Sequence, residues 1–299
     1  MDLHPRQGKY GHAAIFHLHK QTASHKAVDC MLCNLPASEG GKPALLRHSN
    51  VVTFFHEFGH IMHGLCTEGI GNDTRLAKPP RDFVEAPSQM LENWVWQPQV
   101  LRRLSKHYET GEPLPEALIA SLARAKNVNE GLFLSRQCYL AKLDMVLHGP
   151  APPTDAPALD ALVDKLRLEV RGRAPRRALR RNNASQPPPP PSPQLSYMVN
   201  PPGANMLRNF GHLAGQYSAG YYGYLWAEVL SADMWSTVFE KDCFCQKAGM
   251  RYRKQVLAPG GIGNIADHLA AFLGRPPTQE AFLKSRGIVV ADVEVGEAA

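Results

Sequence analysis

The sequence predicts a mainly helical fold that begins with a small β-sheet, and three features of the 299-residue chain support this prediction. Two stretches near the N-terminus, 10–19 and 26–35, alternate in polarity as paired strands do. From Asn50 onward, apolar residues recur at the i, i+3, i+4 spacing of helices. Glycine and proline separate these helical stretches, and the hydrophobic content of 44% is enough to build a core.

The expected helices follow one another with short breaks between them. Their ranges are 50–66, 84–96, 98–108, 115–147, 155–170, 217–240, 262–273 and 278–285. Pro87 fits the second helix only if it lies in the first turn, and Gly274 with the prolines after it separates the last two. No internal repeat is visible, and we expect one domain over residues 1–299.

Composition and charge exclude several classes of protein. No apolar run approaches the roughly 20 residues of a membrane span, and residues 1–21 lack the apolar core of a signal peptide. The net charge is +6, but six arginines in the proline-rich segment 171–200 supply that many positive charges. We interpret this segment as a low-complexity insert, with a basic docking tail as the alternative. We therefore expect no nucleic-acid partner and no membrane partner.

The six cysteines do not define a metal or redox site. Cys30 and Cys33 have a Cys-x-x-Cys spacing, but no second pair completes it. Reduced thiols in a cytoplasmic protein are the better interpretation. We expect a monomer in the cytoplasm, with an organellar location as the alternative if an N-terminal segment is missing.

The stretch 56–60, His-Glu-Phe-Gly-His, carries the strongest chemical signal in the chain. Its histidines are four residues apart, so in a helix both imidazoles project from one face and can share a zinc ion. Glu57 lies beside them as a candidate general base. Such a pentad alone matches by chance in roughly one chain in a hundred, so its surroundings decide its meaning.

The predicted helix around the pentad places its apolar residues on one face and His56, His60 and His63 on the other. The alternative is that this second face is only a solvated polar surface. We expect His63 to be a surface or supporting residue rather than a ligand. Asn50 is expected to cap the helix, and Gly59 to mark the close approach of another backbone or a substrate.

A catalytic zinc site normally has three protein ligands. A third histidine six residues after His60 would be one solution, but Cys66 occupies that position. The other solution is a carboxylate, and the nearby candidates are Glu68, Asp73, Asp82, Glu85 and Glu92. Glu85 is the best of them, because it lies near a helix start and can point back at the first helix. Glu92, two turns further on, would hydrogen-bond to a metal ligand and orient it. The alternative is that Glu85 and Glu92 are both surface acids near a helix N-terminus.

Three blocks of this sequence resemble the thimet oligopeptidase/neurolysin family of zinc metallopeptidases, peptidase family M3. The first joins residues 56–63 to Asp-Phe-Val-Glu-Ala-Pro-Ser-Gln-Met-Leu-Glu-Asn-Trp at 82–94; the others are 210–226 and 2–12. The resemblance covers nearly the whole chain except about 171–200. It implies a zincin-like helical catalytic domain of a channel-type oligopeptidase.

The resemblance also implies the function and the site. His56, His60 and Glu85 would hold one zinc ion, and Glu57 would activate a zinc-bound water to hydrolyse internal bonds of short peptides. The block at 210–226 would contact the substrate, with His212 as a catalytic residue, Tyr224 stabilising the oxyanion, and Tyr217 and Tyr221 gripping the peptide backbone. By spacing alone, these tyrosines could equally be a packed core stripe.

The chain departs from the family in two places. Family members carry a long helical N-terminal part that forms the other wall of a channel, whereas this chain begins just upstream of the catalytic blocks. The alternative function is therefore a catalytically impaired remnant that binds peptides or a partner. The second departure is Gln216, which replaces a frequent glycine and would stiffen the tyrosine loop.

Overall fold

The computed structural model describes residues 1–19, 22, 25–68, 79–170, 207, 210–215 and 217–288. Three features discussed above, Asp73, Gln216 and the 171–200 insert, lie outside the described residues. The chain forms two compact units, which are Met1–Glu130 together with Gly223–Ala299, and Gly131–Tyr222. No helix among the described residues is both long enough and apolar enough to cross a membrane.

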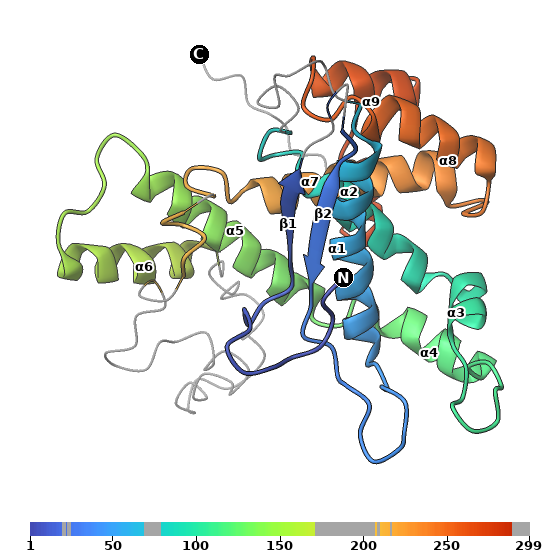
Figure 1. Ribbon diagram of the computed structural model, residues 1–299. Helices are drawn as coiled ribbons and strands as arrows, with labels where there is room; N and C mark the ends of the chain where they lie inside the picture. The colour runs from blue at the N-terminus through green and yellow to red at the C-terminus, as the bar shows by residue number, and fades with distance from the viewer. Residues whose placement is uncertain are drawn as a thin grey trace, which may run out of the picture. The chain divides into compact units, whose positions relative to one another are not determined.

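The first unit begins with a two-stranded sheet beside a long helix. Strands β1 (Ala14–His19) and β2 (Val28–Leu32) pair antiparallel, with a register irregularity near the end of β1. Both strands lie along α1 (His48–Cys66) (Figure 1). Buried residues of β2 and of the segment after it pack on Ile61 of α1, so the sheet covers one side of this helix.

The next elements bring a second helix against α1. Helix α2 (Ala86–Glu92) continues into a 3-10 turn (Asn93–Trp96), followed by α3 (Pro98–Leu104) and α4 (Glu116–Ala125). Pro87 lies in the first turn of α2, where its missing N–H would have had no helical partner. This placement was predicted and is confirmed.

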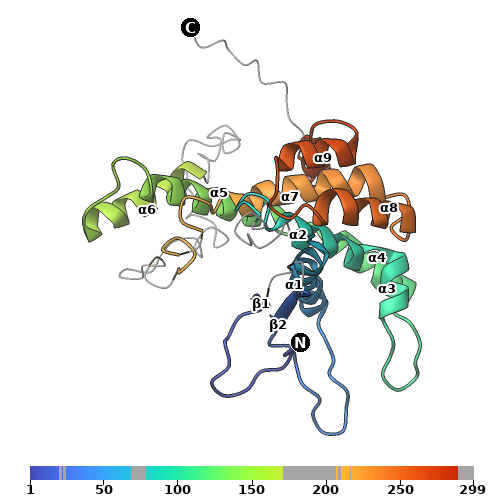
Figure 2. The same cartoon turned by 45° about the horizontal axis from the view of Figure 1, so that its top comes forward.

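The C-terminal part completes the core of the first unit. It contains α7 (Gly223–Met234), a π-turn (Trp235–Phe239), α8 (Gln246–Tyr252), a second π-turn (Arg253–Leu257), α9 (Ile265–Leu273) and α10 (Glu280–Ser285). Helix α7 packs against α2, and α7, α8 and α9 lie together above α2 in Figure 2. Their buried side chains join those of α2 and the end of α1 in one hydrophobic cluster, which holds α2 in place.

The second unit is built on α5 (Glu130–Leu147), whose first residue still belongs to the first unit, and α6 (Ala156–Val170). After the residues that are not described, the chain forms a series of turns over 211–215 and 217–222. These turns contain His212 and the first two predicted site tyrosines.

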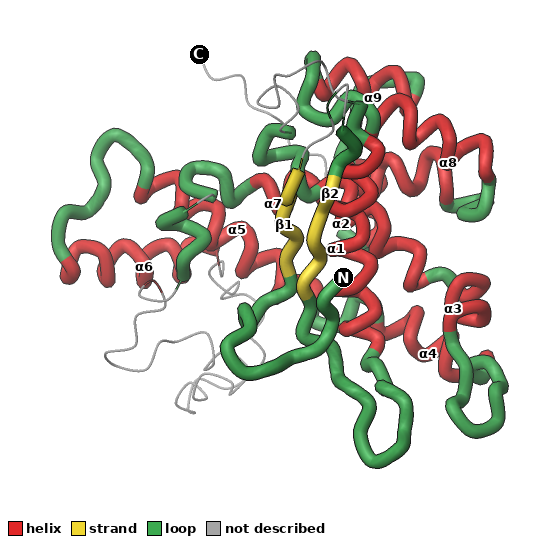
Figure 3. The backbone as a smooth tube through the Cα atoms, viewed as in Figure 1, coloured by secondary structure: helices red, strands yellow, loops and turns green. Residues whose placement is uncertain are grey.

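The predicted fold class, mainly helical with one small sheet, is confirmed (Figure 3). The helix expected over 115–147 is wrong, because it is two helices separated at Asn129, whose φ of 64° is left-handed. The helix expected over 217–240 is also wrong at both ends: Ala219 has a φ of 54°, which interrupts any helix before α7, and the last part is a π-turn.

Other boundaries differ by a few residues, and two consecutive elements were missed. The first helix begins at His48 with Arg47 as its cap residue, so Asn50 is not the cap; its side chain instead accepts a hydrogen bond from the Arg47 N–H. Helix α8 and the π-turn after it were not predicted at all. The remaining expected strands and helices are present but mostly shorter than predicted.

Candidate metal centre

The close approach of α1 and α2 depends on one glycine. A Cβ atom added at Gly59 would lie 2.5 Å from the Ser88 Cα and 2.7 Å from the Pro87 carbonyl oxygen. Both are backbone atoms in the first turn of α2, so only glycine allows the two helices to pack at this distance. The predicted close approach of another backbone at Gly59 is confirmed, and it brings the start of α2 against the pentad.

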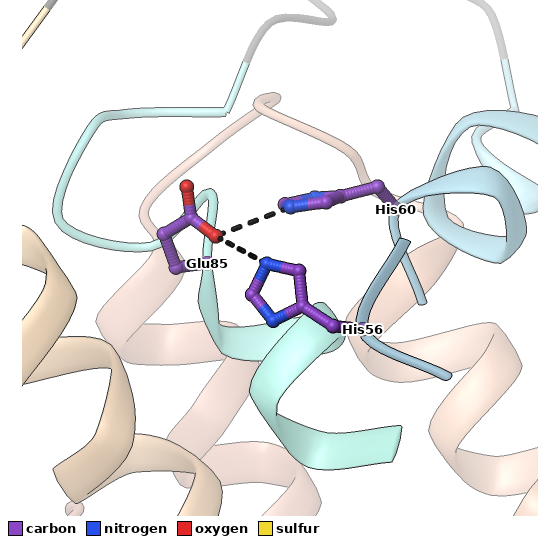
Figure 4. A group of neighbouring side chains, drawn as sticks. All are labelled: His56, His60 and Glu85. Carbon is purple, nitrogen blue, oxygen red and sulfur yellow. Dashed lines mark ion pairs between the residues drawn. The ribbon is translucent and has the colours of Figure 1, made fainter. Parts of the chain in front are cut away.

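This packing places three possible ligands around one point. The side chains of His56 and His60 extend from successive turns of α1, and Glu85 is the residue just before α2. The Glu85 Oε2 atom lies 3.3 Å from His56 Nε2 and 3.1 Å from His60 Nε2 (Figure 4). Ligand atoms of all three residues lie within 4.8 Å of one another, and no other such group occurs among the described residues.

Neighbouring side chains orient these candidate ligands. The Nδ1 atom of His56 lies 2.6 Å from Glu92 Oε1, which leaves Nε2 to face the cluster. The Ser88 hydroxyl donates to the Glu85 backbone oxygen at 2.8 Å and to its carboxylate at 3.2 Å. Glu85 is only 3% exposed, so it is not the surface acid that the alternative interpretation required.

The electrostatics of the cluster favour a cation. Burial lowers the pKa of His56, but hydrogen bonds to Glu85 and Glu92 outweigh it and raise this pKa to about 10. Burial likewise raises the pKa of Glu85, yet the two histidines hold it well below the usual range. Two carboxylates thus face two imidazoles in a largely buried space. A proton on His56 supplies the positive charge when no metal ion is bound. A divalent ion with nitrogen and oxygen ligands fits the same place.

Glu57 lies in the same helix and is 7% exposed. Burial raises the pKa of its carboxyl group, although the neighbouring His56 and His60 act in the opposite direction. Burial raises the pKa of the Cys33 thiol, and the charge of Glu57 raises it further. The Glu57 side chain therefore lies near the segment that follows β2. A carboxylate whose pKa is raised accepts a proton more readily, as a general base must.

The other residues considered for the site do not join it. His63 is 5% exposed rather than at the surface, which corrects that part of the prediction, and its ring packs edge-on against Phe83. Burial, followed by the charges of His60 and His17, lowers the pKa of His63 to about 4, so it is a neutral packing residue. The other two candidate carboxylates that the structure describes, Glu68 and Asp82, lie outside the ligand cluster.

The start of α7 lies next to α2. A Cβ atom at Gly223 would be 2.6 Å from the Arg81 carbonyl oxygen, so this glycine lets α7 begin against the segment before α2. The Gln89 side-chain amide donates to the backbone oxygen of Tyr224 at 3.0 Å. Because Gln89 is one helical turn from Glu85, the backbone of Tyr224 is held to the short helix that directly follows the third candidate ligand.

The remaining predicted site residues belong to the second unit. The ring of His212 lies 5.8 Å from that of Tyr217 and 6.2 Å from that of Tyr221. His212 is exposed, whereas Tyr221 is buried and hydrogen-bonds through its side chain to Arg136 and Gln137 of α5. The three rings therefore form one cluster within this unit.

Sequence reasoning missed Asp144, a fully buried carboxylate of α5. Both of its oxygens accept backbone N–H groups of the tyrosine segment, from Ala219 and Tyr221. An isolated aspartate in a predicted helix gives no signal of such a role, because its partners lie about 75 positions further along the chain.

The fold and the site define the class of protein, which is a mainly helical, zincin-like domain with a His-His-Glu cluster between two helices. The chain belongs to peptidase family M3, whose family model matches residues 1–288. It is 42% identical to saccharolysin of Saccharomyces cerevisiae, 36% to a thimet-like oligopeptidase of Dictyostelium discoideum and 34% to oligopeptidase A of Escherichia coli. Each match covers 96% of this chain but only 38–40% of the relative, so the chain spans about two fifths of their length.

Proposed function

We propose that this chain is the catalytic part of a zinc-dependent metalloendopeptidase that hydrolyses internal bonds of short peptides. The observation that carries the proposal is the convergence of His56, His60 and Glu85, whose ligand atoms lie within 4.8 Å of one another. Nitrogen from two histidines and oxygen from one carboxylate is a common ligand set of catalytic zinc, which leaves a position for water or substrate. Family membership and the names of the relatives point in the same direction.

In this proposal, one zinc ion is held by these three residues, and Glu92 fixes the orientation of His56. When bound, zinc acts as a Lewis acid that polarises the substrate carbonyl and lowers the pKa of water to about 7. Glu57 takes the proton of the attacking water and passes it to the leaving amine. Tyr224 donates a hydrogen bond to the developing oxyanion, while His212 assists catalysis and Tyr217 and Tyr221 bind the peptide backbone.

The test compares zinc content and peptide cleavage in the wild-type chain and in Glu57→Gln. The glutamine keeps the shape of the side chain but cannot take up the proton. We expect about one zinc per chain in both proteins and a kcat/KM in the variant that is lower by about 10²- to 10⁴-fold, the usual contribution of a general base. A fluorogenic peptide measures kcat/KM, and a digest of a mixed peptide library gives the length limit and preference.

Two results would contradict the proposal in different ways. Retention of activity in Glu57→Gln would remove the general-base role. A wild-type chain that binds zinc and short peptides but cleaves none would favour the peptide-binding alternative.

The monomeric state, the single domain over 1–299 and the cytoplasmic location remain predictions.

A further inference from the structure

The segment 217–222 has a backbone conformation that its own sequence does not explain. It is neither helix nor strand; within it the Gly220 N–H donates to Tyr217 O, and the Ser218 N–H donates to Gly215 O just before it. Ala219 has a φ of 54°, a left-handed conformation that is unfavourable for a residue with a Cβ. Something outside the segment must therefore stabilise this conformation.

Asp144 supplies that stabilisation from α5. Its Oδ1 accepts the Ala219 N–H at 3.0 Å, and its Oδ2 accepts the Tyr221 N–H at 2.8 Å. The side chain is completely buried, and its Oδ1 also lies 2.9 Å from His148 Nδ1 on the next turn of α5. Both oxygens of one carboxylate are thus used to fix two backbone groups on either side of Gly220.

A second contact from the same helix fixes the side chain of Tyr221. This tyrosine hydrogen-bonds to Arg136 and Gln137, about two turns before Asp144 on α5. Its ring in turn contacts that of His212, which also lies beside Tyr217. The helix therefore determines where the segment lies, and the segment determines how the His212 and Tyr217 rings meet.

We propose that Asp144 is a positioning residue for the peptidase reaction, because its carboxylate holds 217–222 in the conformation that brings Tyr217 and Tyr221 around His212. This inference rests on the proposed function, in which those three residues contact the substrate. Asparagine cannot replace the carboxylate, because an amide offers one acceptor oxygen and would turn its NH₂ group towards the second backbone N–H. The two backbone N–H groups therefore require a carboxylate at this position, because each donates a hydrogen bond to one of its oxygens.

The test uses the full chain with Asp144→Asn and with Asp155→Asn as a matched control. Asp155 is an exposed aspartate of the same unit whose side chain accepts one backbone N–H, from Ala158, at the start of α6. Asparagine serves equally well there. Hydrogen exchange is followed by mass spectrometry in peptides that cover 217–222 and α6, together with zinc content, kcat and KM.

In Asp144→Asn we expect the Ala219 and Tyr221 amides to exchange about tenfold faster or more, since a buried charge-assisted hydrogen bond is lost from each. Exchange in α6 and the zinc content should not change. The kcat/KM should fall by about 10²-fold, as a displacement of about 1 Å at a substrate-orienting group can cause. Asp155→Asn should match the wild type in all of these measurements.

Unchanged exchange in 217–222 would overturn the inference, whatever the activity. Faster exchange with unchanged kcat and KM would show a purely structural role and would also overturn it. If Asp144→Asn does not fold, His148→Gln keeps the carboxylate but removes its side-chain partner; a smaller rise in exchange of the same segment is expected, and none would contradict the inference. A wild-type chain without peptidase activity would refute the proposed function instead, while the exchange comparison would still decide whether Asp144 holds the segment.

Discussion

The substitution Gly59→Ala tests most sharply how the two helices form the candidate metal centre. The added Cβ would lie 2.5 Å from the Ser88 Cα, whereas carbon atoms in contact are about 3.5–4.0 Å apart. The start of α2 must therefore move by about 1 Å, and Glu85 precedes that turn directly. Zinc–ligand distances lie within about 0.2 Å of their usual values, so such a movement would disturb the site.

Two opposing effects determine the stability of this variant. Alanine is favoured over glycine inside a helix by about 1 kcal/mol, but the clash with backbone atoms costs about 1–3 kcal/mol. We therefore expect the zinc-free protein to be unchanged or destabilised by up to about 2 kcal/mol, the difference of the two. Zinc affinity should also fall, by about 10- to 100-fold.

Gly249→Ala is the matched control, because this glycine lies inside α8 and nothing lies within 4 Å of an added Cβ. It should stabilise the protein by up to about 1 kcal/mol and leave zinc binding unchanged. Urea unfolding of the zinc-free proteins and competition with a zinc chelator measure the two quantities. If Gly59→Ala behaves like Gly249→Ala in both, the close approach of α1 and α2 does not position Glu85, and the reasoning is refuted.

Three further predictions concern the surroundings of the site. Glu92→Gln should weaken zinc binding by about 10- to 100-fold in the chelator assay, because His56 Nδ1 loses its carboxylate; unchanged affinity would exclude the orienting role. In zinc-free protein the folded-state pKa of His56, about 10, exceeds its ordinary value of 6.5, so its stabilisation is complete below pH 6.5 and is lost as the pH rises through about 10. Urea unfolding at a series of pH values should show this loss, and the unfolding free energy of His56→Ala should depend less on pH. An equal pH dependence in the wild type and the variant would attribute the loss to other groups. Ala219→Gly should stabilise the protein by about 1 kcal/mol, since glycine adopts the left-handed conformation without strain; a lower unfolding midpoint would contradict this.

The candidate ligands were predictable because they obey local rules. His56 and His60 are related by helical spacing alone, and Gly59 between them indicated the close approach that the structure contains. Glu85 could be selected because a glutamate near the start of the second predicted helix can point back at the first. The helical class and the small sheet followed equally from periodicity.

Features that depend on distant contacts could not be predicted. The turn at 217–222 depends on Asp144 of a different helix, and nothing near Ala219 in the sequence indicates a left-handed residue. The break at Asn129 was missed because apolar periodicity continues through it. His63 follows the polar spacing of the pentad, yet Phe83 from the segment before α2 packs against it.

The central claim is that His56, His60 and Glu85 together hold one zinc ion, and X-ray absorption at the zinc edge tests it most directly. We predict about one zinc per chain, with nitrogen and oxygen neighbours at about 2.0–2.2 Å and no sulfur. Glu85→Gln should reduce both zinc content and the oxygen contribution. A thiolate signal at about 2.3 Å, or an unchanged spectrum and zinc content in Glu85→Gln, would contradict the claim.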